Sequence, residues 1–286
     1  MNKICIINQP EGLGDILYTQ KIGYNFEKEG YKIFWPVNKA YPTIGNYLQN
    51  FNYFNLYEDH EKDFIKAGLP QECYDVYLKY NGHKGVIHEQ EFGDFLIKFV
   101  PLNHLQAIRP ANEKVMPNTG LIMKKKYSFV GISDTDWKDY LNISRDPKKE
   151  DQLFYEKLGL KDGEEYALIN NNFGTPGMGT VWSFIEKDFI ESESGKKGLK
   201  KINLNFLDGF SLFDWMKVIE NAKEIWQEGS AATYICEKLD LKAEKLYMYS
   251  RTGFGTPEMQ NLFTKPWYFF DRVHGKHSRL SLINDE

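Results

Sequence analysis

The chain has 286 residues, of which 42% are hydrophobic, so it can bury a large core, and its length favours two domains. A net charge of −4 excludes a global basic field, and we expect no stable complex with nucleic acid. The three cysteines, Cys5, Cys73 and Cys236, lie far apart. This spacing argues against a disulfide framework and a zinc cluster, and predicts buried thiols.

Targeting signals are not evident in the sequence. The first residues lack the charged and apolar pattern of a signal peptide, and no apolar run approaches the roughly 20 residues that span a bilayer. We therefore expect a cytoplasmic protein without a transmembrane segment.

The first half reads as alternating strands and helices. "KICIIN" predicts a buried strand, because residues 4–7 are apolar without a break, and the spacing that follows predicts a helix over 16–28. Further expected strands and helices are the strand 31–37, a short helix from Pro42, strands in "YFNLY" and "YDVYLKY", a helix or buried segment over 91–100, a strand at 127–132, and a helix beginning near Asp146 and ending at Gly159.

The second half repeats this alternation. Its expected elements are a strand over 167–169, strand 201–207, helix 211–222, strand 223–228, helix 231–239 and strand 245–250. Right-handed crossovers would make such a series a parallel sheet. The polar, glycine-bearing "GLKDGEE" predicts the domain boundary, giving domains 1–160 and 161–286, each α/β and Rossmann-like.

Two loops carry residues with little packing value. In "NQPEGLGD", glycines lie between the first strand and its helix, where the carboxyl ends of parallel strands bind ligands and glycine permits close approach. In "EGSAATY", Glu228, Gly229 and Ser230 precede a helix that starts at Ala231. Unpaired N–H groups at a helix start favour a phosphate, although Ser230 as a simple helix cap remains an alternative.

Both loops resemble segments of the heptosyltransferase-like (ADP-heptose transferase) family of GT-B-fold glycosyltransferases. "EGLGDILYTQKI" is similar to the family's N-terminal "GD-[IV]-L" segment, and "EGSAATY" to its "D-[TS]-G-x-x-H" loop. Here Glu228 replaces the usual Asp and Thr233 stands at the His position. The resemblance covers about the first thirty residues and 165–250. It implies two Rossmann-like domains facing across a cleft.

The resemblance also implies roles for individual residues. Asp15 would be the general base toward an acceptor hydroxyl, and a helix-start acid favoured by the dipole is the alternative. The residues expected to bind the acceptor are Gly12, Leu13 and Gly14. The residues expected to bind the donor are Asn172, Gly174, Phe206, Leu207, Asp208, Glu228, Gly229, Ser230, Ala231 and Arg251.

The expected function is transfer of a sugar from a nucleotide-sugar donor to a glycan or glycolipid acceptor, with inversion implied by the use of a base. Domain 1–160 would bind the acceptor and domain 161–286 the donor. No metal or other cofactor is expected. Alternatives are a Rossmann-type oxidoreductase, although "QPEGLGD" lacks the G-x-G-x-x-G spacing, and a non-catalytic carbohydrate-binding protein of the same fold.

Overall fold

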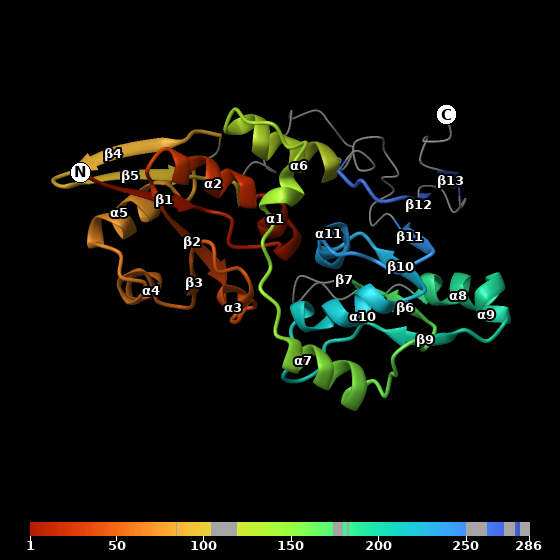
Figure 1. Ribbon diagram of the computed structural model, residues 1–286. Helices are drawn as coiled ribbons and strands as arrows, with labels where there is room; N and C mark the ends of the chain where they lie inside the picture. Colours follow the sequence, from red (N-terminus) through yellow and green to blue (C-terminus); the bar gives the residue numbers. More distant parts are fainter. Residues whose placement is uncertain are drawn as a thin grey trace. The chain divides into compact units, whose positions relative to one another are not determined.

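A computed structural model of the chain describes residues 1–83, 85–103, 119–173, 180–181, 183–249, 262–271 and 278–280. The chain forms two compact units, Met1–Ser144 and Arg145–Glu286. Each unit is built on its own sheet (Figure 1).

The first unit contains a five-stranded sheet with the order β3-β2-β1-β5-β4. Its strands are β1 (Asn2–Ile7), β2 (Lys32–Asn38), β3 (Asn52–Leu56), β4 (His88–Phe92) and β5 (Phe95–Val100). β1 pairs in parallel with β2 and β5, and β4 alone among these strands runs antiparallel. Its helices are α1 (Leu13–Tyr18), α2 (Gln20–Lys28), α3 (Ile44–Tyr47), α4 (His60–Lys66), α5 (Gln71–Tyr80), α6 (Thr119–Phe129) and the 3-10 helix η2 (Trp137–Tyr140).

Helices cover both faces of this sheet. Phe34 of β2 belongs to a core shared with α4 and α5, while its neighbour Trp35 points to the opposite face, as strand alternation requires. There Trp35 stacks on Phe51, which also lies directly against Gly23 of α2. The unit is therefore a three-layer α/β/α arrangement.

The second unit contains a six-stranded sheet with the order β13-β12-β11-β10-β6-β9. Its strands are β6 (Tyr166–Asn170), β9 (Lys200–Asn203), β10 (Glu224–Glu228), β11 (Lys245–Tyr249), β12 (Trp267–Asp271) and β13 (Ser278–Leu280), and a separate hairpin pairs β7 (Asn172–Phe173) with β8 (Thr180–Val181). Of the six strands, β13 is antiparallel to its neighbour. Its helical segments are α7 (Pro147–Asp151), η3 (Gln152–Lys157), α8 (Ser183–Glu191), α9 (Glu193–Lys196), η4 (Leu212–Trp215), α10 (Met216–Asn221) and α11 (Ala231–Lys238).

Two parallel-rich sheets confirm the predicted class, α/β with two Rossmann-like units. The pairing of β9, β6, β10, β11 and β12 also confirms the parallel sheet expected from the β-α-β-α-β series. That the two units face each other across a cleft stays a prediction.

The boundary between the units lies at Ser144–Arg145, not at residue 160. The helix α7 and its π-helical continuation η3 pack on the second unit, where the Arg145 guanidinium binds the Glu220 carboxylate at 2.7 Å. The polar "GLKDGEE" segment marks the end of this helix, with Gly159 at φ 60°, rather than the end of a domain.

Four expected elements differ in the structure. "YDVYLKY" is part of helix α5, because Cys73, Val76 and Tyr77 recur at helical spacing and face the core. The strand expected at 127–132 is instead the end of α6, and the helix or buried segment at 91–100 is a β4–β5 hairpin that turns at Gly93 (φ 54°). The strand expected over 201–207 ends at Asn203.

The buried cysteines are confirmed. All three thiols are free and buried. Burial raises the pKa of Cys73 and of Cys236 to about 12 and raises that of Cys5 further, so these thiols stay protonated at neutral pH.

Candidate functional site

The loop after β1 lies at the point where the order of the first sheet reverses. The chain leaves β1 toward β2 and β3 on one side, and β5 joins β1 on the other side. In open parallel sheets, ligands bind outside the carboxyl ends of the strands at this switch point. The Asn8 N–H donates to the Val100 carbonyl at 2.9 Å, so the loops that follow β1 and β5 run together there.

Asp15 lies in the first turn of α1, close to this switch point. Its side chain is 23% exposed, and its carboxylate forms an ion pair with Lys126 of α6. Gly12 precedes the helix with φ 73°, and a Cβ at that position would lie 2.5 Å from Asp15 Oδ2. Leu13 and Gly14 are half-buried beside it. The backbone of Gly12 therefore lies close against one carboxylate oxygen, and Lys126 binds the other.

Tyr41 also belongs to this cluster. Burial raises the pKa of its hydroxyl. Hydrogen bonds from the backbone N–H groups of Leu13 and Gly12 partly offset this rise, because they lower the same pKa. The Tyr41 hydroxyl thus lies at the start of α1, near the Asp15 carboxylate. The sequence offered no signal for Tyr41, because the contact joins the loop after β2 to the loop after β1.

Replacing Gly12 with alanine tests how closely Asp15 is held. The new Cβ would meet Asp15 Oδ2, and the left-handed backbone costs about 1–2 kcal/mol for a residue with a side chain. We expect a lower midpoint of thermal unfolding together with loss of the predicted sugar transfer.

Gly30→Ala is the matched control. Gly30 has φ 86°, and its nearest neighbour to an added Cβ is Lys3 Cδ at 3.9 Å, far from any carboxylate. The control should lose similar stability and keep its turnover. Equal turnover in both variants would show that Asp15 does not depend on the space at Gly12.

The second sheet also has a switch point, between β6 and β10. β9 joins β6 on one side and β10 joins it on the other. Asn170 ends β6, and its side-chain amide donates to the Ser230 hydroxyl at 3.1 Å. The predicted loop after β10 therefore lies at the position where such sheets bind ligands.

At the start of α11, the backbone N–H groups of Gly229 and Ser230 already have acceptors. The Gly229 N–H donates to the Tyr249 carbonyl at 3.1 Å, and the Ser230 N–H donates to the Thr233 hydroxyl at 3.2 Å. Ser230 and Thr233 form a reciprocal capping box, which confirms the capping role considered for Ser230. Within the described part of the chain, the N–H of Ala231 has no acceptor. Glu228, at the end of β10, is buried.

The loop after β9 presents an aromatic ring to solvent. Phe206 is 84% exposed, Leu207 is half-buried and Asp208 is exposed. Asp208 does not cap the following helix, because Ser211 does so through its bond to Asp214 at 2.7 Å. An exposed phenyl ring at the carboxyl edge of the sheet is available for stacking.

Three of the residues expected to bind the donor are described in part or not at all. Asn172 lies in β7, opposite Val181 of β8. Gly174 and Arg251 lie outside the described residues.

No protein-family model matches the sequence, and no curated protein matches it. Among solved structures, the chain is similar to a glycosyl transferase of family 9 from Veillonella parvula, with 12% identity, a TM-score of 0.47, and 87% of this chain and 80% of that chain covered. It is also similar to the E. coli heptosyltransferase WaaC with ADP-2-deoxy-2-fluoro heptose, with 12% identity, a TM-score of 0.45, and 96% and 94% covered. A third structure is the iron-containing dodecameric glycosyltransferase TibC from enterotoxigenic E. coli, with 12% identity, a TM-score of 0.45, and 96% and 64% covered.

Lys126 is the main residue that sequence analysis missed. The composition of "KKKY" at 124–127 is typical of a solvated face, yet Lys126 is fully buried while Lys125 is exposed. Its ammonium donates to Gln9 Oε1 at 2.7 Å and pairs with Asp15. Helical spacing of Met123, Lys126 and Tyr127 would have placed all three on one buried face.

Asp134 and Asp136, which resemble a metal-binding acid pair in sequence, bind side chains of α1 and α2. The Tyr18 hydroxyl donates to Asp134 at 2.7 Å, and Lys21 forms an ion pair with Asp136. In the part of the chain that the structure describes, no group of three or more His, Cys, Asp or Glu could hold a metal ion. No helix in the same ranges has the length and hydropathy that a membrane crossing needs.

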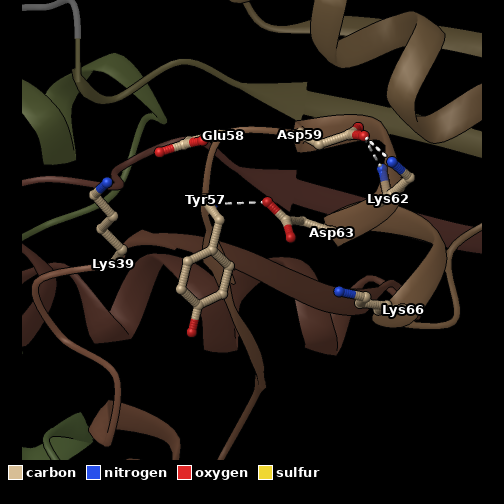
Figure 2. A pocket seen from close by; sticks show the side chains of 7 residues that line it. All are labelled: Lys39, Tyr57, Glu58, Asp59, Lys62, Asp63 and Lys66. Carbon is tan, nitrogen blue, oxygen red and sulfur yellow. Dashed lines mark hydrogen bonds and ion pairs between the residues drawn. The ribbon is translucent and has the colours of Figure 1, made fainter.

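A separate cavity of about 270 Å³ lies where β2 and β3 end and α4 begins (Figure 2). Seven residues line it: Lys39, Tyr57, Glu58, Asp59, Lys62, Asp63 and Lys66. The Tyr57 N–H donates to Asp63 at 2.6 Å, and Asp59 pairs with Lys62. Its three lysines are matched by three carboxylates, so the lining has no excess charge that would attract an anion.

Proposed function

We propose that the chain is a glycosyltransferase that moves a sugar from a nucleotide-sugar donor to a hydroxyl of a glycan or glycolipid. The observation that carries this proposal is the placement of both predicted loops. Each of the two parallel sheets has its predicted loop at its switch point, with Asp15 in one unit and the start of α11 in the other. This placement supports Asp15 for proton removal and the start of α11 for diphosphate binding, because open parallel sheets bind ligands at such edges.

The donor side is supported by the geometry around α11. The Ala231 N–H and the positive end of the helix dipole favour an anion next to Ser230, and small side chains leave space for it. Phe206, 84% exposed after β9, would stack on the nucleotide base. The E. coli heptosyltransferase WaaC has been solved with ADP, so ADP is a suitable first probe.

The proposed chemistry is a single inverting displacement without a metal ion. The acceptor oxygen attacks the anomeric carbon and forms the new glycosidic bond, while the bond from that carbon to the diphosphate oxygen breaks. Asp15 takes the proton of the acceptor hydroxyl, and the nucleoside diphosphate leaves with the electron pair of the broken bond. The Ala231 N–H and the positive end of the α11 dipole stabilise the negative charge that grows on the leaving diphosphate.

A substitution at Gly229 tests the donor site. An added Cβ there would lie 3.9 Å from Met248 Sδ and 4.0 Å from the Tyr249 carbonyl, which is ordinary contact. We therefore expect Gly229→Ala to fold and to bind nucleotide nearly normally. Gly229→Leu should weaken binding by about 10-fold or more, because its longer side chain enters the space beside the helix start.

The measurement is calorimetric titration with ADP, UDP, GDP and CDP, followed by both variants with the nucleotide that binds most tightly. Thermal unfolding of each variant checks that the fold is kept. Unchanged affinity in a folded Gly229→Leu chain would place the diphosphate elsewhere. Binding of none of the four nucleotides would contradict the proposed donor class.

A further inference from the structure

The ammonium of Lys126 is buried beside the carboxylate of Asp15. Lys126 is the third lysine of a run on α6, and its side chain is 0% exposed. A buried ammonium is costly unless it is paired and hydrogen-bonded. The two oxygens that receive its hydrogen bonds belong to Asp15 and to Gln9.

Gln9 is itself held in place, so the position of the ammonium is well defined. Its side-chain amide donates to the Glu11 backbone carbonyl at 2.5 Å, and the backbone carbonyl of Gln9 accepts a hydrogen bond from Trp35 Nε1 at 3.2 Å. Gln9 and Trp35 are both buried. Because Gln9 is fixed in the core of the first unit, the Lys126 ammonium that it binds also holds one oxygen of Asp15 in a defined position.

The other oxygen of Asp15 lies over Gly12, where the structure allows no side chain. Since Lys126 takes Oδ1, Oδ2 is the oxygen left to accept a proton. The Tyr41 hydroxyl also lies near the Asp15 carboxylate.

We propose that Lys126 is the positioning residue of Asp15: it holds the carboxylate in one orientation, an inference that rests on the proposed function. The role is distinct from a purely structural ion pair. A structural pair would matter only for folding, whereas a positioning residue changes turnover through Asp15 alone.

The test uses the full chain and measures release of nucleoside diphosphate from ADP-, UDP- and GDP-sugars, and of CMP from CMP-sugars, with water as the acceptor. Lys126→Met should lower kcat by about 10- to 100-fold and leave the donor KM unchanged. Lys125→Met, an exposed neighbour on α6, is the control and should behave like the unsubstituted chain.

A double-mutant cycle separates positioning from structure. If Lys126 acts through Asp15, then Asp15→Asn and the double variant Asp15→Asn/Lys126→Met should have the same residual kcat within about twofold. If the two losses of kcat multiply in the double variant, Lys126 does not act through Asp15 and the proposal is wrong. An unchanged kcat in a folded Lys126→Met chain would also overturn it.

Two further outcomes are also decisive. If Lys126→Met fails to fold, Lys126→Gln replaces the long ammonium side chain with a shorter amide, and its kcat should still fall while the donor KM stays unchanged. An unchanged kcat in that folded variant would overturn the proposal. Failure of the unsubstituted chain to cleave any donor would contradict the proposed function, and the role of Lys126 with it.

Discussion

Replacing Asp15 with asparagine is expected to lower transfer by about 100-fold or more, as loss of a general base does. Asparagine has nearly the same shape and can still accept a bond from Lys126, but it cannot take a proton. Donor affinity should stay near normal, because Asp15 belongs to the first unit and the proposed diphosphate site to the second. The measurement compares kcat with nucleotide affinity from calorimetry.

Stability must be followed in the same variant. Asp15→Asn leaves the buried Lys126 ammonium facing a neutral amide, which is destabilising for a buried charge. The double variant Asp15→Asn/Lys126→Met removes both charges and should recover stability without recovering activity. Glu27→Gln on α2 is the surface control, since Glu27 is exposed. Full activity in a folded Asp15→Asn chain would remove Asp15 from the mechanism.

Replacing Glu237 with alanine is expected to cause the largest loss of stability in the second unit. The carboxylate of Glu237, on α11, is 4% exposed and accepts hydrogen bonds from Thr264 at 2.8 and 2.9 Å, from Lys265 at 3.3 Å and from Trp267 Nε1 at 2.7 Å. Removing it leaves several donors without an acceptor, at a cost of about 3–4 kcal/mol. The midpoint of thermal unfolding should fall by roughly 10 °C.

The fluorescence of tryptophan reports this unfolding directly, because Trp267 is one of the groups that lose a partner. Glu237→Gln keeps one acceptor oxygen and should lose less stability. Glu244→Ala removes an exposed carboxylate of the same unit and should change the midpoint little. Equal midpoints for Glu237→Ala and Glu244→Ala would show that the carboxylate does not anchor the segment before β12.

The local sequence was sufficient where one residue pattern determines one structure. Four unbroken apolar residues predicted β1, and Asp146 with Pro147 and Gly159 predicted a capped helix, which the structure confirms with Lys149 N–H donating to Asp146 at 3.2 Å. The same holds for the start of α11, where Ser230 is the cap. Such patterns act within a few residues, so no knowledge of the rest of the fold was needed.

For short aromatic segments, the local sequence alone does not determine the secondary structure. "YDVYLKY" has strand-like composition, yet it is part of α5, because the core of the first unit takes Cys73, Val76 and Tyr77 at helical spacing. Packing outweighs propensity in segments of this length. The domain boundary was misplaced for a related reason, since only the contacts of Arg145 and α7 show which unit the helix joins.

The sequence by itself determined the alternation of strands and helices, the two α/β units and the positions along the chain of the two glycine-bearing loops, because hydrophobic periodicity and glycine placement act along the chain. Only the tertiary structure decided the strand order that brings each loop to a switch point, and the surroundings of Asp15. Lys126 lies 111 residues after Asp15 in the chain, and burial of its charge depends on how α6 packs. A local sequence pattern cannot predict such a contact, because it forms only when segments far apart in the chain pack together.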